Sequence, residues 1–159
     1  YENKKVLPRT FLTCGWEQES NPQEIMKKIS LLPNAGEKVF VQRELNVSCK
    51  SHEALGQAQI IHYSAGEMVI DVKAPSSRIL VLSDIFFPGW KVLIDDKKEQ
   101  MLKVDYVLKG VVVPAGQHKV KFIYDPQSFK IGAGISILAF LALMGLIGYE
   151  VIRSRDSSS

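Results

Sequence analysis

The feature that most constrains this chain is an uncharged apolar run near its C-terminus. Residues 131–149 read IGAGISILAFLALMGLIGY. As an α-helix this run is about 28 Å long, close to the roughly 30 Å hydrocarbon core of a bilayer. A buried helix of a small soluble domain seldom needs so long a stretch without charge. The run therefore predicts a transmembrane helix over residues 130–152, followed by a short tail, 153–159.

The charges that flank this run predict its orientation. Arg153 and Arg155 follow it, and Lys130 precedes it. The positive-inside rule places the arginine-bearing tail in the cytoplasm, so that residues 1–129 lie on the extracytoplasmic side. Small residues recur at every third position of the run. This spacing favours packing against other transmembrane helices over a helix that contacts only lipid.

Composition limits what the remaining residues can be. The chain has 159 residues, 46% of them hydrophobic and 23% charged, which excludes an intrinsically disordered protein. One domain fits before the apolar run, and two do not fit comfortably. The net charge of +3 is scattered along the sequence, whereas nucleic-acid binding needs a clustered basic surface. We therefore expect the membrane as a partner and no nucleic acid.

Residues 57–125 carry the pattern of β-strands. Apolar and polar side chains alternate over residues 68–73 and again over 119–124. This period of two is typical of strands with one face in water. Turn signals interrupt the chain about every ten residues, with no helical pattern between them. The sequence predicts a mainly β fold, an antiparallel β-sandwich of jelly-roll or immunoglobulin-like type.

The first third of the chain predicts one short helix. Asn21 suits an N-cap, Pro22 suits the first helical position, and Glu24 stands three residues after the cap. The helix is expected to end near Leu31, before Pro33. A strand is expected on each side of it, at residues 9–13 and at 39–41.

Several short motifs occur in a characteristic order. They read LSDIFFPGWKV over residues 82–92, VVVPAGQH over 111–118 and FIYDPQSFKIG over 122–132, after LPRTF over 7–11. Together they resemble the C-terminal region of the YfhO family of bacterial multi-span membrane proteins. The chain departs from that family at Asp95-Asp96, where the family usually has Asp-Gly, so a longer turn that runs on to Lys98 is expected there.

The resemblance implies a parent protein similar to the C class of membrane glycosyltransferases. Such enzymes take a sugar from a polyprenyl-phosphate carrier, here for transfer to a cell-wall polymer such as lipoteichoic acid. Their catalytic acid lies in an early extracytoplasmic loop, so no catalytic residue is assigned to this chain, and no cofactor is expected in it. The implied role is an accessory domain that positions the acceptor or caps the membrane domain, with upstream transmembrane helices as partners.

Three residues are candidates for ligand contact. The ring of Trp90 suits stacking on a sugar, Asp84 suits accepting hydroxyl hydrogen bonds, and Tyr124 stands in the last motif. The other interpretation places Trp90 in the sandwich core, and we favour it because such cores commonly contain a buried tryptophan. The matching alternative function is a structural or protein-interaction β-sandwich without sugar contact.

Other reactive side chains give weaker signals. Five aspartates, most of them at expected turns, argue against an acid–base pair: Asp84, Asp95, Asp96, Asp105 and Asp125. His52, His62 and His118 lack metal-ligand spacing, so no metal site is predicted. Cys14 and Cys49 form either one disulfide or two free thiols.

Overall fold

The computed structural model describes residues 7–34, 36–47 and 54–156. The chain divides into two compact units, Tyr1–Asp125 and Pro126–Ser159. The first is a β unit with one short helix, and the second contains a single long helix, α2 (Gln127–Asp156). The sequence expectation placed the boundary between domain and helix four residues later, after residue 129.

The β unit is built from eleven strands and α1 (Pro22–Leu31). The strands are β1 (Thr10–Thr13), β2 (Gly15–Gln18), β3 (Lys38–Val41), β4 (Gln57–Tyr63), β5 (Glu67–Ala74), β6 (Arg78–Ile85), β7 (Trp90–Ile94), β8 (Lys97–Glu99), β9 (Leu102–Val104), β10 (Leu108–Val113) and β11 (Gly116–Tyr124). Sheet A has six strands in the order β1-β6-β10-β9-β3-β2, and sheet B has five in the order β4-β5-β11-β7-β8.

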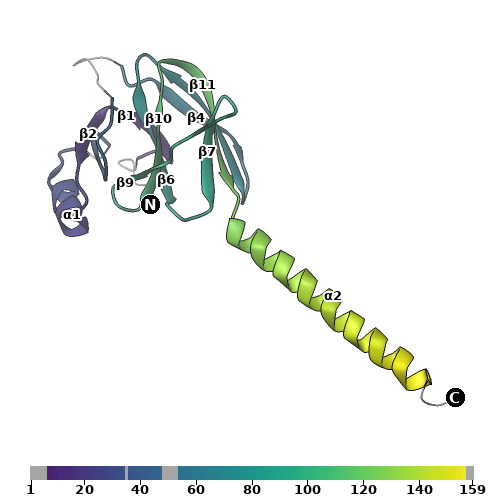
Figure 1. Ribbon diagram of the computed structural model, residues 1–159. Coiled ribbons are helices and arrows are strands. Elements are labelled where there is room, and N and C mark those ends of the chain that lie inside the picture. Colours follow the sequence, from purple (N-terminus) through teal and green to yellow (C-terminus); the bar gives the residue numbers. More distant parts are fainter. Residues whose placement is uncertain (1–6, 35, 48–53, 157–159) are drawn as a thin grey trace, which may run out of the picture. The chain divides into compact units, whose positions relative to one another are not determined.

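The two sheets pack face to face around one apolar core (Figure 1). Sheet B contributes the alternate residues that the period of two had predicted, among them Met68, Ile70 and Phe122. Sheet A contributes Leu80 from β6 and Val111 from β10. A mainly β, two-sheet sandwich is therefore confirmed. The finer jelly-roll or immunoglobulin-like assignment stays a prediction.

A second core covers the other face of sheet A. It gathers side chains from β3, β6 and β9 and from the segment that follows β3, where Leu45 and Val47 are buried. Strand β6 is therefore buried on both faces, and residues 78–82 are all buried. This explains why β6 has a continuous apolar run instead of alternation.

The N-terminal region corrects the prediction of a wholly antiparallel sandwich. β2 and β3 pair in parallel, with Trp16 opposite Val39. Two parallel strands need a crossover connection, and α1 supplies it. The helix begins and ends as predicted, because the Asn21 side chain accepts a hydrogen bond from the Gln23 amide at 3.0 Å and Leu32 is the C-cap.

The turn between β7 and β8 is shorter than expected. Lys97 already pairs with Ile94, so Asp95 and Asp96 form a two-residue hairpin loop. Both have positive φ, 48° and 64°, the left-handed conformation of a hairpin turn that favours Asn-Gly or Asp-Gly. The expectation of a longer turn that runs on to Lys98 is therefore wrong.

Helix α2 confirms continuous helix at the apolar run. Its large apolar side chains from Phe129 to Ile147 are exposed. In the described part of the chain, however, no helix is both long enough and apolar enough to cross a membrane. The helix is confirmed, whereas the transmembrane helix predicted over 130–152 is not.

Cys14 is disulfide-bonded. Of the two interpretations left open for the cysteines, free thiols are therefore wrong for Cys14. Cys49 lies outside the described residues.

Candidate functional site

The structure brings the three candidate ligand residues to one end of the β unit. Asp84 lies near the end of β6, Trp90 begins β7, and Tyr124 ends β11. Tyr124 pairs directly with Trp90 across the two strands. Their ring centroids are 5.4 Å apart with the planes tilted by 46°, within the range of favourable aromatic pairs.

Lys109 joins Asp84 to this aromatic pair. It extends from β10, is only 2% exposed, and places its Nζ 3.4 Å from the centroid of the Trp90 ring. Burial lowers the pKa of the Lys109 amine, while the Asp84 carboxylate acts in the opposite direction. A cation over the face of tryptophan is a favourable arrangement when water is excluded. Sequence reasoning missed Lys109, because a lysine at the start of a strand is usually on the surface.

Arg9 completes the group from the N-terminal side. Its Nη2 donates to Asp84 Oδ1 at 3.1 Å and to the Tyr63 hydroxyl at 2.9 Å. The guanidinium also stands 4.2 Å from the centroid of the Tyr63 ring. These hydrogen bonds, first to Tyr63 and then to Asp84, raise the pKa of Arg9. We call the set the aromatic–cation cluster, and its members are Arg9, Tyr63, Asp84, Trp90, Lys109 and Tyr124.

The members of the cluster differ in how accessible they are. Tyr63 is 56% exposed and Tyr124 is 37% exposed, so both rings offer surface to a ligand. Trp90 is partly buried and packs against the core between the sheets. Its ring is already engaged by Lys109 and Tyr124. The geometry thus favours a core role for Trp90, and ligand contact by Trp90, Asp84 and Tyr124 stays a prediction.

The five aspartates are each occupied by a different partner. Asp84 binds Arg9, Asp95 binds His118, Asp96 binds Lys121, Asp105 accepts from the Phe40 amide, and Asp125 binds Lys91. These contacts suit structural ion pairs and caps. No arrangement among them resembles an acid and a base that face a common substrate.

Among the described residues, no group of three or more His, Cys, Asp or Glu side chains is arranged to hold a metal ion. His118 instead places its Nδ1 2.7 Å from Asp95 Oδ2. His62 is exposed, and His52 lies outside the described residues.

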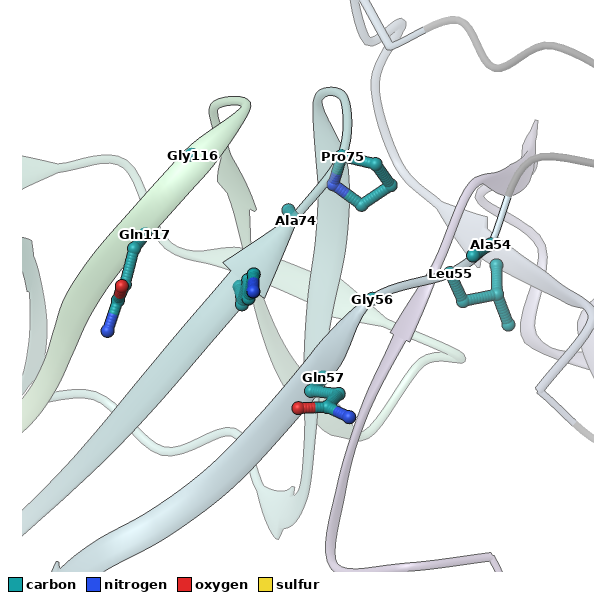
Figure 2. A pocket seen from close by; sticks show the side chains of 9 residues that line it. Ala54, Leu55, Gly56, Gln57, Ala74, Pro75, Gly116 and Gln117 are labelled. Atoms are coloured by element: carbon teal, nitrogen blue, oxygen red, sulfur yellow. The ribbon is translucent and has the colours of Figure 1, made fainter.

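A pocket of about 550 Å³ opens at the opposite end of the β unit, where β11 begins. Figure 2 shows Gln57 on β4 and Gln117 on β11, the strands on either side of β5, and labels Leu55 and Pro75 among the other lining residues. Lys73 stands in register between the two glutamines. None of the candidate residues from the sequence lines this pocket.

The wall of this pocket is held by close backbone packing. Gly56 has φ of +95°, and a Cβ there would come within 2.2 Å of the Lys73 carbonyl oxygen. The fully buried Arg78 donates to the Ala54 carbonyl at 3.0 Å. These contacts are part of the fold, and they are sufficient to explain the shape of the pocket wall.

Comparison with known proteins places this geometry in context. The family described as "Bacterial membrane protein YfhO" matches residues 43–136, more than half of the chain. A protein of Bacillus subtilis (strain 168) named "Uncharacterized protein YfhO" is 24% identical over 85 residues, covering 54% of this chain and 10% of that protein. No solved structure matches. The resemblance drawn from the motifs is confirmed, and the matched range contains Asp84, Trp90, Lys109 and Tyr124.

Proposed function

Because this chain belongs to the YfhO family of bacterial membrane proteins, we propose that it is the accessory extracytoplasmic domain of a polytopic glycosyltransferase-like protein. In this proposal the parent takes a sugar from a polyprenyl-phosphate carrier and transfers it to a cell-wall polymer such as lipoteichoic acid. The β unit positions the acceptor polymer. The reacting groups belong to other parts of the parent, since the matched segment covers only 10% of the Bacillus relative.

The observation that carries this proposal is the exposed side of the aromatic–cation cluster. Two tyrosine rings, Tyr63 and Tyr124, are accessible in the cluster, and Arg9 joins Tyr63 to the carboxylate of Asp84. Aromatic faces suit the apolar faces of sugar rings, and a carboxylate held by arginine suits hydroxyl groups. A site with both features at the edge of a rigid sandwich fits the recognition of a glycan.

A second candidate function has its own support. The Lys109–Trp90 contact and the packing of Trp90 on the core favour a structural or protein-interaction β-sandwich with no sugar contact. In that case the cluster serves to hold sheet A to sheet B at this end of the domain.

Variants of the accessible residues separate the two functions. Tyr124→Ala and Asp84→Asn are introduced into the full parent protein in bacterial membranes, and sugar transfer to the polymer is measured together with the thermal midpoint. Loss of one aromatic contact of about 1 kcal/mol corresponds to a roughly fivefold weaker interaction with the acceptor. We expect transfer at low acceptor concentration to fall by about that factor, with the midpoint nearly unchanged.

Met26→Ala is the matched control, because Met26 is 62% exposed on α1 and lies outside the cluster. It is expected to leave transfer unchanged. Wild-type transfer by both cluster variants would reject the glycan role and favour the structural one.

A further inference from the structure

One end of the β unit exposes an unusual number of large apolar side chains. We call it the loop-end surface, and it consists of Ile85 (73% exposed), Phe87 (57%), Tyr106 (39%) and Val107 (45%). Single exposed apolar residues are ordinary, but a group of them on one surface marks an interaction site.

Backbone hydrogen bonds show that these residues share one end of the unit. The Phe86 amide donates to the Val107 carbonyl at 2.6 Å, which joins the β6–β7 loop to the β9–β10 loop. The Tyr124 amide donates to the Gly66 carbonyl at 2.8 Å, and the Asp125 amide to the Gly89 carbonyl at 2.7 Å. The loops are therefore fixed side by side around the end of β11.

The β9–β10 loop holds its apolar residues outward at a conformational cost. Asp105 and Tyr106 have φ of 47° and 68°, a conformation that a bulky residue such as tyrosine rarely adopts. The Asp105 carboxylate stabilises the loop by accepting from the Phe40 amide at 2.8 Å. Lys103 then places its Nζ 4.2 Å from the centroid of the exposed Tyr106 ring.

We propose that the loop-end surface lies in the headgroup region of a lipid bilayer. Tyrosine rings with lysine and arginine beside them are typical of residues at a membrane–water interface, where one end of the side chain is apolar and the other is wet. Lys103 stands over the Tyr106 ring, and its ammonium suits a lipid phosphate. Ile85 and Phe87 are apolar and exposed, as side chains that insert between headgroups are.

Two further facts favour lipid over another occupant. The chain belongs to a family of membrane proteins. The β6–β7 loop, which bears Phe87, also holds Asp125, the last residue of the β unit, through the hydrogen bond from the Asp125 amide to the Gly89 carbonyl. This inference goes beyond the proposed function, because lipid contact requires no sugar.

The test measures the distance of each end from lipid headgroups. The full parent protein, with its other reactive cysteines replaced, receives Phe87→Cys, or Val107→Cys from the second loop, and is labelled with a nitroxide. It is reconstituted in nanodiscs with and without a lipid that carries chelated Ni²⁺ on its headgroup. Leu55→Cys is the matched control, because Leu55 is 46% exposed at the opposite end of the unit.

We expect the Ni²⁺ lipid to speed relaxation of the nitroxide at positions 87 and 107 several-fold more than at position 55. Each variant is first checked for an unchanged thermal midpoint, and the two loop positions serve as independent reporters. Equal enhancement at the two ends, or none at positions 87 and 107, would overturn the proposal.

Discussion

The two ends of the β unit differ in which side chains are paired, which are buried and which are exposed. At the hairpin end, Asp95 and Asp96 adopt strained backbone conformations, and each carboxylate finds a local partner, His118 or Lys121. At the loop end, Lys109 is buried against Trp90 while Phe87 is exposed. At the hairpin end the two carboxylates are paired within the domain. The loop end exposes apolar side chains, as a surface that binds lipid or another molecule does.

The largest expected effect tests whether Trp90 is a core residue. Trp90→Ala removes a ring that packs on the core and carries the Lys109 ammonium. We expect the free energy of unfolding in urea to fall by roughly 2–4 kcal/mol, somewhat less than for a fully buried aromatic. Phe87→Ala is the control, and a change below about 0.5 kcal/mol is expected because that ring is exposed. Equal small losses would show that Trp90 contributes little to the fold.

Two glycines, one tightly packed and one in open space, test the same difference between interior and surface. A Cβ on Gly110 would lie 2.5 Å from Val104 Cγ2 and 3.2 Å from the Leu80 carbonyl oxygen. Because Val104 is stiff and fully buried, Gly110→Ala is expected to lower stability by about 1–3 kcal/mol. Gly66→Ala meets nothing within 4 Å and is expected to change it little. Thermal unfolding compares the two, and similar midpoints would contradict the close packing of β9 and β10.

At the hairpin turn we expect a substitution by glycine to increase stability relative to its matched variant. Asp96 has φ of 64°, where glycine is unstrained. Asp96→Gly and Asp96→Asn both remove the ion pair with Lys121, so the difference between them reports the backbone alone. We expect the glycine variant to be more stable than the asparagine variant by about 0.5 kcal/mol in chemical unfolding. A less stable glycine variant would mean that side-chain contacts, and not backbone strain, govern this turn.

The smallest expected effect is a pH dependence at the hairpin end. The hydrogen bond to Asp95 raises the pKa of His118, and that of Asp95 is lowered chiefly by His118 and then by the Lys119 amide. The stabilisation from His118 is full below its unfolded pKa of about 6.5 and is lost as pH rises through the folded value. The stabilisation from Asp95 is present above its unfolded pKa and is lost as pH falls through the depressed folded value.

Thermal midpoints measured from pH 3 to 9 test the direction of this pH dependence. The midpoint is expected to decline slightly between pH 6 and pH 8.5 in the wild type. His118→Gln retains a polar side chain without that titration, and its decline over the same interval is expected to be smaller. An identical decline in both proteins would mean that the His118–Asp95 contact does not contribute.

Local pattern predicted the elements that depend on neighbouring residues alone. The Asn21 cap and Pro22 define where α1 starts, because both act on the first helical turn. Alternation placed Ile70 and Phe122 in the core, because successive strand residues point to opposite faces. The same reasoning could not place Lys109, since its burial arises from Trp90 on the other sheet.

The parallel pairing of β2 and β3 was also outside the reach of local pattern. A strand carries no mark of its partner, and the crossover through α1 decides the direction. The aromatic–cation cluster has the same origin, because Lys109 of sheet A and Trp90 of sheet B meet only when the sheets close.

The sequence by itself determined the membrane-protein family, the β character of residues 57–125 and the helical apolar segment, because motif order and side-chain periodicity are written along the chain. Only the tertiary structure decided which cations are buried, which aromatic rings stay exposed, and which loops share one end of the unit. Those properties depend on contacts between residues distant in sequence, and it is the closing of two sheets over a common core that creates them.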